Sequence, residues 1–446
     1  MGMVSLREKI AYGLGDAASS IFWKLFTVYL LFFYTDVFGL EASLAGTMFF
    51  ITRIWNALLD PVVGVMADRT ETRWGKFRPY LLYLAIPFGI MGVVTFTVPA
   101  LSPAGKVVYA YVSYSLMMAV YSLINVPYAA LLGVISPASG VRTALSSYRM
   151  IFAFAGSLVV LLLIEPLVGL FGGGGSGGAG GQAFGWQMGV GVFAAVAAGL
   201  FFLCFRWTTE RVRPVEAQKP SLRQDLRGLL GDRAWWLLLA AGAATLAFHS
   251  VRDGAVVYYF KYVVSGSCGV DLPFTAIPLT LTTLYLVIGQ GANIVGIILV
   301  NPLSKRIGKK NSFLLAMLFA TAFNVAFFFM GEGDIVPIMC LQALISLCAG
   351  VVAPLLWAMC ADVADHAEWK TGRRATGLIF SSVSMSQKVG WSIGGALTGW
   401  LLAYYGFQAN TTQTDAVLYG IRLMLSFFPA MATLLAAAFI CRYPLR

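Results

Sequence analysis

Several long apolar stretches of this chain carry ionisable or amide side chains, and these are the residues that could do chemistry. In the first stretch, Asp16 and Ser20 stand four residues apart, so a helix would place both on one face. In the second, Arg53, Asn56 and Asp60 follow at spacings of three and four residues, which is again one helical stripe. An ionisable side chain at the centre of a bilayer costs about 2.5–3.5 kcal/mol on insertion scales, so it tends to face a cavity or a partner.

The pair of Asn56 and Asp60 offers oxygen atoms to a small cation. A carboxylate beside an amide can hold a proton, or it can bind Na⁺, because hard cations prefer oxygen ligands. The sequence therefore predicts that Asp60 binds a coupling ion, either H⁺ or Na⁺. The alternative is a structural ion pair between Arg53 and Asp60 that joins two helices. No other metal site and no organic cofactor are predicted.

The fourth apolar stretch carries Tyr121, Ser122 and Asn125 just before Pro127. The proline removes a backbone hydrogen bond and favours a kink in a helix. Ser122 and Asn125 could bind a ligand, or they could form hydrogen bonds between helices, which is the commoner use of such residues in lipid.

Single cations stand well inside two further stretches, Arg149 in the fifth and Lys388 in the eleventh. An unpaired cation there is a poor structural element, so a substrate or coupling role is predicted for both. In the seventh stretch, Arg252 or His249 is expected to pair with Asp253. Because the sequence shows no nucleophile–base pair, metal-ligand cluster or nucleotide loop, an enzyme is not expected.

The composition indicates lipid as the surroundings of most of the chain. Of its 446 residues, 59% are hydrophobic and 11% are charged, and the mean hydropathy is +0.78. Soluble proteins have about 45–50% apolar and about 25% charged residues. The net charge of +11 does not indicate nucleic-acid binding, because the basic residues form short clusters between apolar runs and no continuous stripe.

A helix that crosses the hydrocarbon core needs about 20 mostly apolar residues. The sequence predicts an all-α membrane protein with twelve such helices, in two six-helix bundles at residues 1–206 and 235–446, joined by a cytoplasmic linker at 207–234. A repeated motif supports the two halves, because Arg73-Trp-Gly-Lys76 recurs as Arg306-Ile-Gly-Lys309 after the corresponding helix. The predicted spans are 11–35, 43–66, 79–99, 107–132, 145–171, 185–206, 235–262, 277–302, 312–330, 335–360, 376–403 and 417–441.

The distribution of Lys and Arg predicts the orientation, because cytoplasmic loops are rich in both. With the N-terminus inside, the outer loops keep only Lys106, Lys261 and Arg422, and both termini are cytoplasmic. Residues 362–370, after the tenth span, mix acids and bases and are predicted to be a cytoplasmic loop with salt bridges between helices.

The chain resembles the glycoside–pentoside–hexuronide:cation symporters of the major facilitator superfamily, which are relatives of the melibiose permease. Within that family it is closest to the branch that takes glucuronides, sulfoquinovose and α-xylosides. The motifs that carry the resemblance are Tyr12-Gly-Leu-Gly-Asp16, Phe33-Tyr-Thr-Asp-Val-Phe-Gly39, Arg53-Ile-Trp-Asn-Ala-Leu-Leu-Asp-Pro61, Arg73-Trp-Gly-Lys-Phe-Arg-Pro79, Asn125-Val-Pro-Tyr128, Trp357, and Asp362 through Glu368-Trp-Lys-Thr-Gly372.

The resemblance implies a major facilitator fold, alternating access and a sugar site at the bundle centre. The cation-coupling residues that it implies are Asn56, Asp60 and Ser122. The predicted substrate-binding residues are Asp16, Ser20, Tyr121, Asn125, Arg149, Trp357 and Lys388.

The chain departs from the melibiose permease at the residues that hold a neutral galactoside. Ser20 and Asn125 stand where that protein has acids, Asn56 replaces the first acid of its cation site, and Leu59 replaces an amide. Loss of acids makes the site more positive, so an anionic sugar such as a hexuronide or a sulfonated glycoside is predicted. Loss of oxygen ligands favours H⁺ over Na⁺, bound at Asp60 or Asp16.

Two alternatives stay open at this point, a neutral glycoside carrier and a carrier of lipids or lysolipids. The expected partners are a small sugar and the lipid bilayer, with no nucleic acid, and the expected state is a functional monomer. From the resemblance, the expected location is a bacterial plasma membrane, the inner membrane where there are two.

Overall fold

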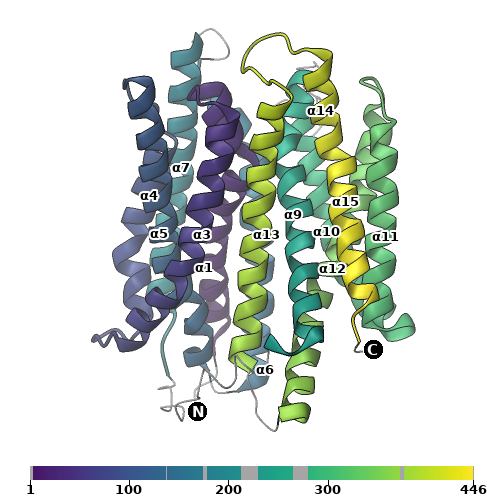
Figure 1. Cartoon of the computed structure of the whole chain (residues 1–446). Helices are drawn as coiled ribbons and strands as arrows, with labels where there is room; N and C mark the ends of the chain where they lie inside the picture. The colour runs from purple at the N-terminus through teal and green to yellow at the C-terminus, as the bar shows by residue number, and fades with distance from the viewer. Residues whose placement is uncertain are drawn as a thin grey trace. The chain divides into compact units, whose positions relative to one another are not determined.

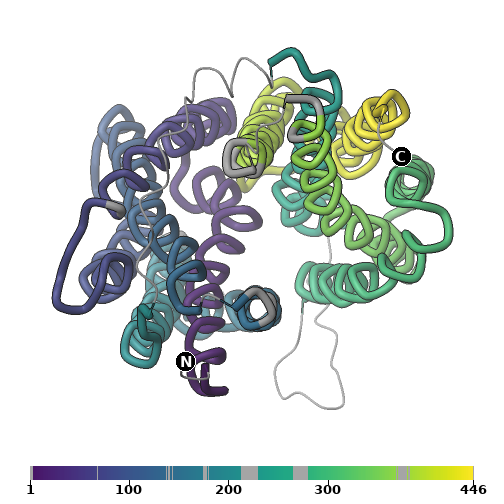
Figure 2. The backbone as a smooth tube through the Cα atoms, turned by 90° about the horizontal axis from the view of Figure 1, so that it is seen from below, coloured from purple at the N-terminus to yellow at the C-terminus, as the bar shows by residue number. Residues whose placement is uncertain are grey.

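The chain is built from long α-helices with short π-helical segments (Figures 1 and 2). The computed structural model describes residues 4–136, 138–173, 178–211, 230–264, 280–371 and 376–444. Within these ranges no β-strand occurs, and the only β-bridge is an isolated one between Thr72 and Gly75.

The first half of the chain begins with a helix capped by Ser5, whose hydroxyl accepts from the backbone N–H of Glu8. This first span changes twice from α- to π-helical geometry along its length. Its elements, and those that follow, are α1 (Leu6–Lys24), η1 (Leu25–Tyr29), α2 (Leu30–Phe32), η2 (Phe33–Val37), α3 (Ala42–Arg69), α4 (Arg78–Thr95), α5 (Pro103–Ile135), α6 (Ser139–Phe171) and α7 (Gly178–Trp207).

The second half repeats the plan of long helices, and its last span is broken at Ser426. Its elements are α9 (Arg233–Tyr258), η3 (Tyr259–Val263), α10 (Leu281–Ile307), α11 (Lys309–Phe328), α12 (Ile335–Thr371), α13 (Thr376–Tyr404), α14 (Asp415–Leu425) and α15 (Phe427–Cys441).

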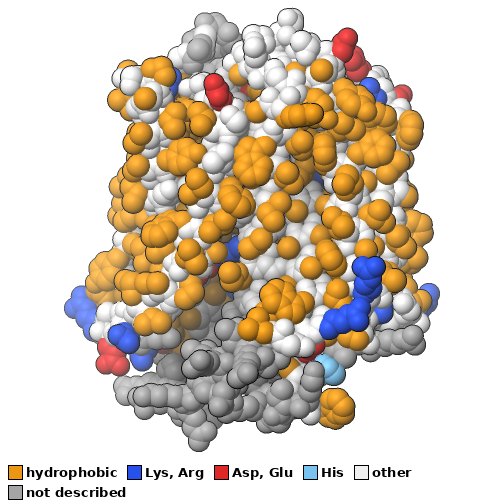
Figure 3. All heavy atoms as spheres, viewed as in Figure 1, with side chains coloured by type: hydrophobic (Ala, Val, Ile, Leu, Met, Phe, Trp, Pro, Cys, Tyr) orange, Lys and Arg blue, Asp and Glu red, His pale blue; other side chains and the backbone are white. Residues whose placement is uncertain are grey.

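Among the described residues, eleven spans are long and apolar enough to cross a membrane. α13, with 29 residues, is the twelfth helix of comparable length, so each of the twelve predicted spans is confirmed as a helix. Many large apolar side chains on these helices are exposed, among them Ile86, Val108 and Ile298, each more than 60% exposed. Apolar side chains cover the face drawn in Figure 3, as expected of helices that face lipid.

Helix α12 corrects one prediction. The sequence predicted a loop at residues 362–370, but α12 continues without interruption to Thr371. The reason is local, because no glycine or proline occurs between Pro354 and Gly372 to end the helix. The predicted salt bridge between helices is present, since Lys309 Nζ lies 2.6 and 2.8 Å from the two carboxylate oxygens of Asp362.

The contacts divide the chain into two compact units. The first comprises Met1–Leu44, Ile51–Glu216 and Asp271–Leu279, and the second comprises Ala45–Phe50, Ala217–Val270 and Thr280–Arg446. The predicted linker at 207–234 falls for the most part outside the described residues, so the predicted domain limits stay predictions.

In the first unit, α1 packs closely on its neighbours because glycines face it. A Cβ added to Gly156 of α6 would lie 2.6 Å from the carbonyl oxygen of Ala17. A Cβ on Gly92 of α4 would lie 2.0 Å from the ring of Phe22. Small residues allow membrane helices to approach at backbone distance, which maximises packing where lipid removes the hydrophobic driving force. This approach brings the polar residues of α1 next to those of α6.

At the other end of α1, the buried Glu8 ties the start of the chain to the segment after α7. Its two carboxylate oxygens accept from the guanidinium of Arg211 at 2.6 and 2.8 Å, and Oε1 also accepts from the backbone N–H of Thr209. The hydrogen bonds that Arg211 donates to the Glu8 carboxylate raise the pKa of Arg211 above its ordinary value.

The next residue of that segment, Glu210, caps the start of α4. Its carboxylate accepts from the backbone N–H groups of Lys76, Phe77 and Arg78 at 2.8, 2.8 and 2.9 Å. Negative charge at a helix N-terminus satisfies donors that have no partner within the helix and interacts favourably with the helix dipole. Gly75 is required here because its φ is +110° and a Cβ would lie 2.4 Å from the Glu210 carboxyl carbon.

Replacement of Glu210 by glutamine is expected to lower the free energy of unfolding by about 1–3 kcal/mol, because three backbone donors lose a charged acceptor. Thermal unfolding of the purified protein in detergent measures the change. Glu71→Gln is the matched control, since Glu71 is 81% exposed and lies 3.8 Å from Lys76. We expect no measurable shift for that exposed pair. Equal losses in the two variants would contradict the capping role.

Candidate functional site

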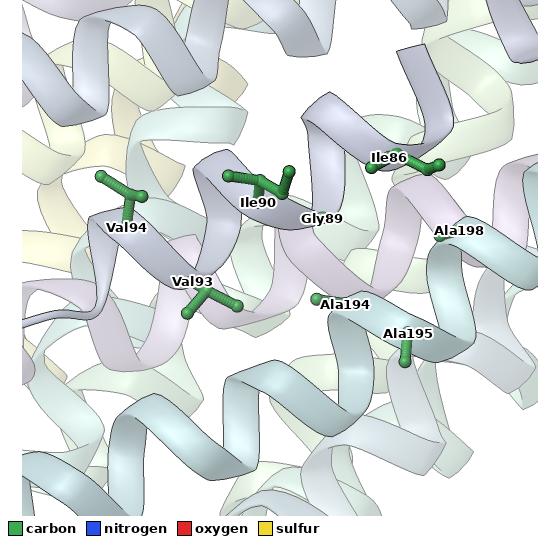
Figure 4. Close-up of a pocket in the computed structure, with 8 residues that line it drawn as sticks. All are labelled: Ile86, Gly89, Ile90, Val93, Val94, Ala194, Ala195 and Ala198. Carbon is green, nitrogen blue, oxygen red and sulfur yellow. The ribbon is translucent and has the colours of Figure 1, made fainter. Parts of the chain in front are cut away.

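The cavity between α4 and α7 is apolar (Figure 4). Its volume is about 350 Å³, and Ile86 and Ile90 at its edge are more than half exposed. A sugar placed here would lose the hydrogen bonds of its hydroxyl groups without replacement. This cavity therefore suits apolar chains of the surrounding lipid and is not a sugar site. The residues that line it are Ile86, Gly89, Ile90, Val93, Val94, Ala194, Ala195 and Ala198.

A polar cluster inside the first unit centres on an ion pair between α1 and α6. Arg149 Nε lies 3.1 Å from Asp16 Oδ2, and the guanidinium carbon of Arg149 lies 5.4 Å from the ring centroid of Tyr128. The Arg149 side chain is 35% exposed and that of Asp16 is 15% exposed. The sequence treated Arg149 as an unpaired cation, and this was wrong. Residues 133 positions apart meet only because α1 and α6 pack closely.

Tyr128 is held beneath Arg149 by Tyr12 of α1. The two rings stack with centroids 4.9 Å apart and an interplanar angle of 21°, and the Tyr128 hydroxyl donates to the Tyr12 carbonyl at 2.6 Å. Sequence reasoning did not assign either tyrosine to the site. The signal was present, because Tyr12 lies one helical turn before Asp16 and Tyr128 lies one turn after Asn125.

Asn125 of α5 is the centre of a second contact with α1. Its Oδ1 accepts from the Ser19 hydroxyl at 2.7 Å, and its Nδ2 donates to the Tyr121 carbonyl at 3.0 Å. The sequence predicted Ser20 on the stripe of Asp16, and Ser20 is half-buried in the same turn. Successive helix residues point about 100° apart, so Ser19 and not Ser20 faces Asn125.

Tyr121 lies between two aromatic side chains. Its ring centroid is 5.7 Å from that of Trp23 and 6.1 Å from that of Phe88. The guanidinium of Arg53 lies over the Trp23 ring, 5.8 Å from its centroid. Trp23 was not predicted as a site residue, although it stands three residues after Ser20 on the same helix.

The three predicted cation-coupling residues form one chain of hydrogen bonds between α3 and α5. Asn56 Nδ2 donates to the Ser122 hydroxyl at 2.6 Å and to the Met118 carbonyl at 2.7 Å. The Ser122 hydroxyl in turn donates to Asp60 Oδ1 at 2.6 Å. Asn56 and Ser122 are buried, and Asp60 is half-buried. Asn56 therefore donates to Ser122, and Ser122 donates to Asp60 Oδ1.

Two predicted substrate residues belong to the second unit. Trp357 of α12 is 38% exposed. Lys388 of α13 is half-buried, and its carbonyl accepts from the Ser392 hydroxyl at 2.8 Å. Their roles stay predictions.

The second unit also holds a buried arginine, Arg252 of α9, which is 6% exposed. It donates hydrogen bonds to neutral groups on four other helices. One of these groups is the carbonyl that the break between α14 and α15 leaves without a helical donor. The four acceptors are the Tyr285 hydroxyl, Asn324 Oδ1, Gln342 Oε1 and the Leu425 carbonyl. The predicted pairing of Asp253 with Arg252 or His249 stays a prediction.

No group of three or more His, Cys, Asp or Glu side chains that could hold a metal ion occurs among the described residues. The predicted site residues of the first unit include an ion pair, Asp16 with Arg149, and the Asp60 carboxylate at the end of a chain of hydrogen bonds.

Comparison with known proteins shows the family of the chain. The family described as "MFS/sugar transport protein" matches residues 11–446. The inner membrane symporter YicJ of Escherichia coli is 36% identical over 99% of this chain and 92% of its own length. The isoprimeverose transporter of Lactiplantibacillus pentosus is 34% identical over 98% of this chain and 88% of its own length.

Among solved structures, a bacterial homologue of the human lysosomal transporter Spinster matches with a TM-score of 0.71 at 16% identity, over 98% of this chain and 97% of that one. At this identity the likeness shows the fold alone, which is that of a major facilitator. The relatives and the family match go further, because they cover nearly the whole sequence. The chain therefore belongs to the major facilitator sugar transport proteins, and within them to the glycoside–pentoside–hexuronide:cation symporters.

Proposed function

We propose that this protein is a cation-coupled symporter that imports a glycoside or sugar acid by alternating access. The observation that carries the proposal is the chain of hydrogen bonds from Asn56 through Ser122 to Asp60, built into the same unit as the ion pair of Asp16 and Arg149. One site can then hold the coupling ion while the other binds the sugar. The relatives, a symporter and a sugar transporter by name, support this combination.

The coupling ion is H⁺, bound at Asp60. The Ser122 oxygen already accepts a hydrogen bond from Asn56, and its own proton points toward Asp60 Oδ1. A Na⁺ ion that bridged the Ser122 oxygen and Asp60 Oδ1 would meet the proton that lies between them, so Ser122 would have to give up this hydrogen bond. A proton on the carboxylate leaves the chain of donors in place, so the geometry favours H⁺.

The predicted substrate residues of each unit carry groups that suit a sugar. In the first unit, Arg149, Asn125 and Tyr121 present donors and an aromatic ring to the hydroxyl groups and the face of the sugar, with Ser20 beside them. Asp16 balances the charge of Arg149. In the second unit, Lys388 binds an acidic substituent and Trp357 packs against the ring.

A neutral glycoside is the second candidate substrate, because Asp16 already neutralises Arg149 and Lys388 alone then favours an acid. A lipid or lysolipid is disfavoured, because the cluster of Arg149, Asn125 and Asp16 offers hydrogen bonds where an acyl chain needs an apolar wall. We further propose that the protein is a functional monomer in a bacterial plasma membrane, with both termini in the cytoplasm.

Uptake into proteoliposomes tests the proposal. The panel consists of a phenyl glucuronide, a neutral phenyl α-xyloside and a lysophosphatidylcholine, each with and without a pH gradient and with and without Na⁺. We expect gradient-driven uptake of the glycosides and none of the lysolipid. Uptake of the lysolipid but of neither glycoside would overturn the proposal. So would uptake of the glycosides that is the same with and without the pH gradient and Na⁺.

Replacing Lys388 by glutamine separates the two sugar classes. Loss of one charge-assisted hydrogen bond costs about 1.5–3 kcal/mol, so KM for the glucuronide should rise about 10- to 100-fold. KM for the neutral xyloside should change less than about threefold, because no charge is lost from its contacts. Arg233→Gln, at the exposed start of α9, is the control and should leave both values unchanged. Equal increases for the two sugars would contradict binding of the acid by Lys388.

A further inference from the structure

The motif Tyr12-Gly-Leu-Gly-Asp16 has a physical explanation in the contacts of Arg149. Asp16 of the motif forms the ion pair with Arg149, and Tyr12 stacks on Tyr128, over which the guanidinium lies. The two glycines provide space for these contacts. Each residue of the motif except Leu14 therefore takes part in placing one guanidinium group.

Gly13 allows α6 to approach. A Cβ at Gly13 would lie 2.5 Å from the Phe152 ring and 3.1 Å from the Tyr148 carbonyl oxygen, and Tyr148 directly precedes Arg149. Any larger residue at position 13 would push the α6 backbone away at the level of the ion pair. The short distance between Asp16 and Arg149 thus depends on the absence of a side chain one turn earlier.

Gly15 makes room for Tyr128. A Cβ there would lie 2.5 Å from Tyr128 Cε2 and 3.1 Å from Cys204 Sγ. With glycine present, the Tyr128 ring lies flat on Tyr12, and its hydroxyl is anchored to the Tyr12 carbonyl. The ring therefore has a fixed position beneath the guanidinium, 5.4 Å from its carbon.

These contacts fix how Arg149 presents its donors. The closest contact joins Arg149 Nε to Asp16 Oδ2, and about a third of the Arg149 side chain remains exposed (35%). The planar fork of an arginine matches two neighbouring oxygen atoms. Because Asp16 balances its charge, the fork recognises oxygen spacing more than negative charge.

We propose that Asp16 and Tyr128 are positioning residues that present the terminal nitrogens of Arg149 as a fork for two neighbouring hydroxyl oxygens of the sugar ring. The inference rests on the proposed function, because it needs a sugar to bind. The recognised group is then a vicinal diol, and the motif Tyr12–Asp16 of α1 serves to position Arg149.

A double-mutant cycle on KM tests the positioning role. The single variants Asp16→Asn and Gly15→Ala should each raise KM for the neutral α-xyloside about tenfold, with Vmax changed less than about twofold. Arg149→Lys keeps the charge but loses the fork, and should raise KM about tenfold or more. If Asp16 acts only through Arg149, Asp16→Asn adds no further increase in the Arg149→Lys background. A purely structural role would give independent, multiplying effects.

The 2-deoxy and 4-deoxy analogues of the xyloside identify the diol, because each keeps only one of the two vicinal diols of the ring. The analogue that lacks a hydroxyl of the recognised diol should bind the wild-type protein about tenfold more weakly, and the other should bind about as well as the parent sugar. Arg149→Lys should not distinguish between the two analogues. Glu165→Gln is the matched control, because Glu165 is another α6 carboxylate and accepts from Tyr29 at 3.2 Å; it should leave KM unchanged.

Thermal unfolding of the same variants without sugar makes a failure of this inference distinguishable from a failure of the proposed function. The cycle of Asp16→Asn and Arg149→Lys should show coupling in unfolding temperature, since the ion pair exists without substrate. Coupling in unfolding but additive effects on KM would overturn the positioning role while sugar uptake persists. If the wild-type protein takes up no glycoside at all, the proposed function fails, and the inference of a sugar fork fails with it.

Discussion

The Asp60→Asn variant is expected to lose gradient-driven accumulation of sugar almost completely, while it retains exchange of sugar across the membrane. Asparagine preserves the shape of the side chain and can still accept from Ser122, so the chain of hydrogen bonds between α3 and α5 should survive. It cannot take up a proton. Binding of the ion then no longer favours one conformational state, and the energetic coupling between ion and sugar disappears.

The measurement is the ratio of internal to external sugar in proteoliposomes under an imposed pH gradient, beside counterflow without a gradient. We expect accumulation to fall to the level of equilibration, because without a bound proton the pH gradient no longer supplies free energy to sugar transport. Counterflow should fall less than about threefold and should lose its pH dependence. Asp415→Asn, at the exposed start of α14, is the control acid and should change neither value.

Ser122→Ala is the companion variant, because it removes the hydroxyl that links Asn56 to Asp60. It should weaken coupling without abolishing it, since the carboxylate remains. Accumulation by Asp60→Asn at the wild-type level would remove Asp60 from the mechanism. A gradient of Na⁺ that drives uptake at constant pH would replace the proton by sodium at the same residue.

Replacement of Arg252 by methionine is expected to destabilise the second unit more than any other single change considered for it. Methionine replaces the unbranched stem of the side chain, but it is shorter than arginine and donates no hydrogen bond. Four buried acceptors on α10, α11, α12 and α14 would lose their donor at once, and the Leu425 carbonyl would remain open at the helix break. A loss of about 3–5 kcal/mol follows from hydrogen bonds to a charged group and the unsatisfied acceptors left behind.

Thermal unfolding in detergent, followed by tryptophan fluorescence, measures this loss. Arg252→Lys should recover part of it, because one ammonium reaches fewer of the acceptors. Arg422→Gln is the matched control, since Arg422 donates to the carbonyls of Phe328 and Met330 from a half-buried position. Its loss should be about 1 kcal/mol. If methionine at position 252 unfolds at the wild-type temperature, the cluster contributes no stability.

The sequence alone determined the helices and their number, because a bilayer requires about 20 apolar residues per span regardless of what packs beside them. It also determined that Asn56 and Asp60 share one face, since helical periodicity is a local property. The pairing with Ser122 came from the resemblance to a family, and the structure confirms that these three side chains meet.

The tertiary structure decided which distant side chains meet. Arg149 forms an ion pair with Asp16, and Asn125 accepts a hydrogen bond from Ser19 instead of Ser20. Arg252 donates hydrogen bonds to acceptors on four helices. These outcomes depend on the rotation and axial position of each helix relative to its neighbours, to within one residue. Such quantities are set by the sum of many contacts, including the glycines that let backbones approach, and no local pattern in the chain encodes them.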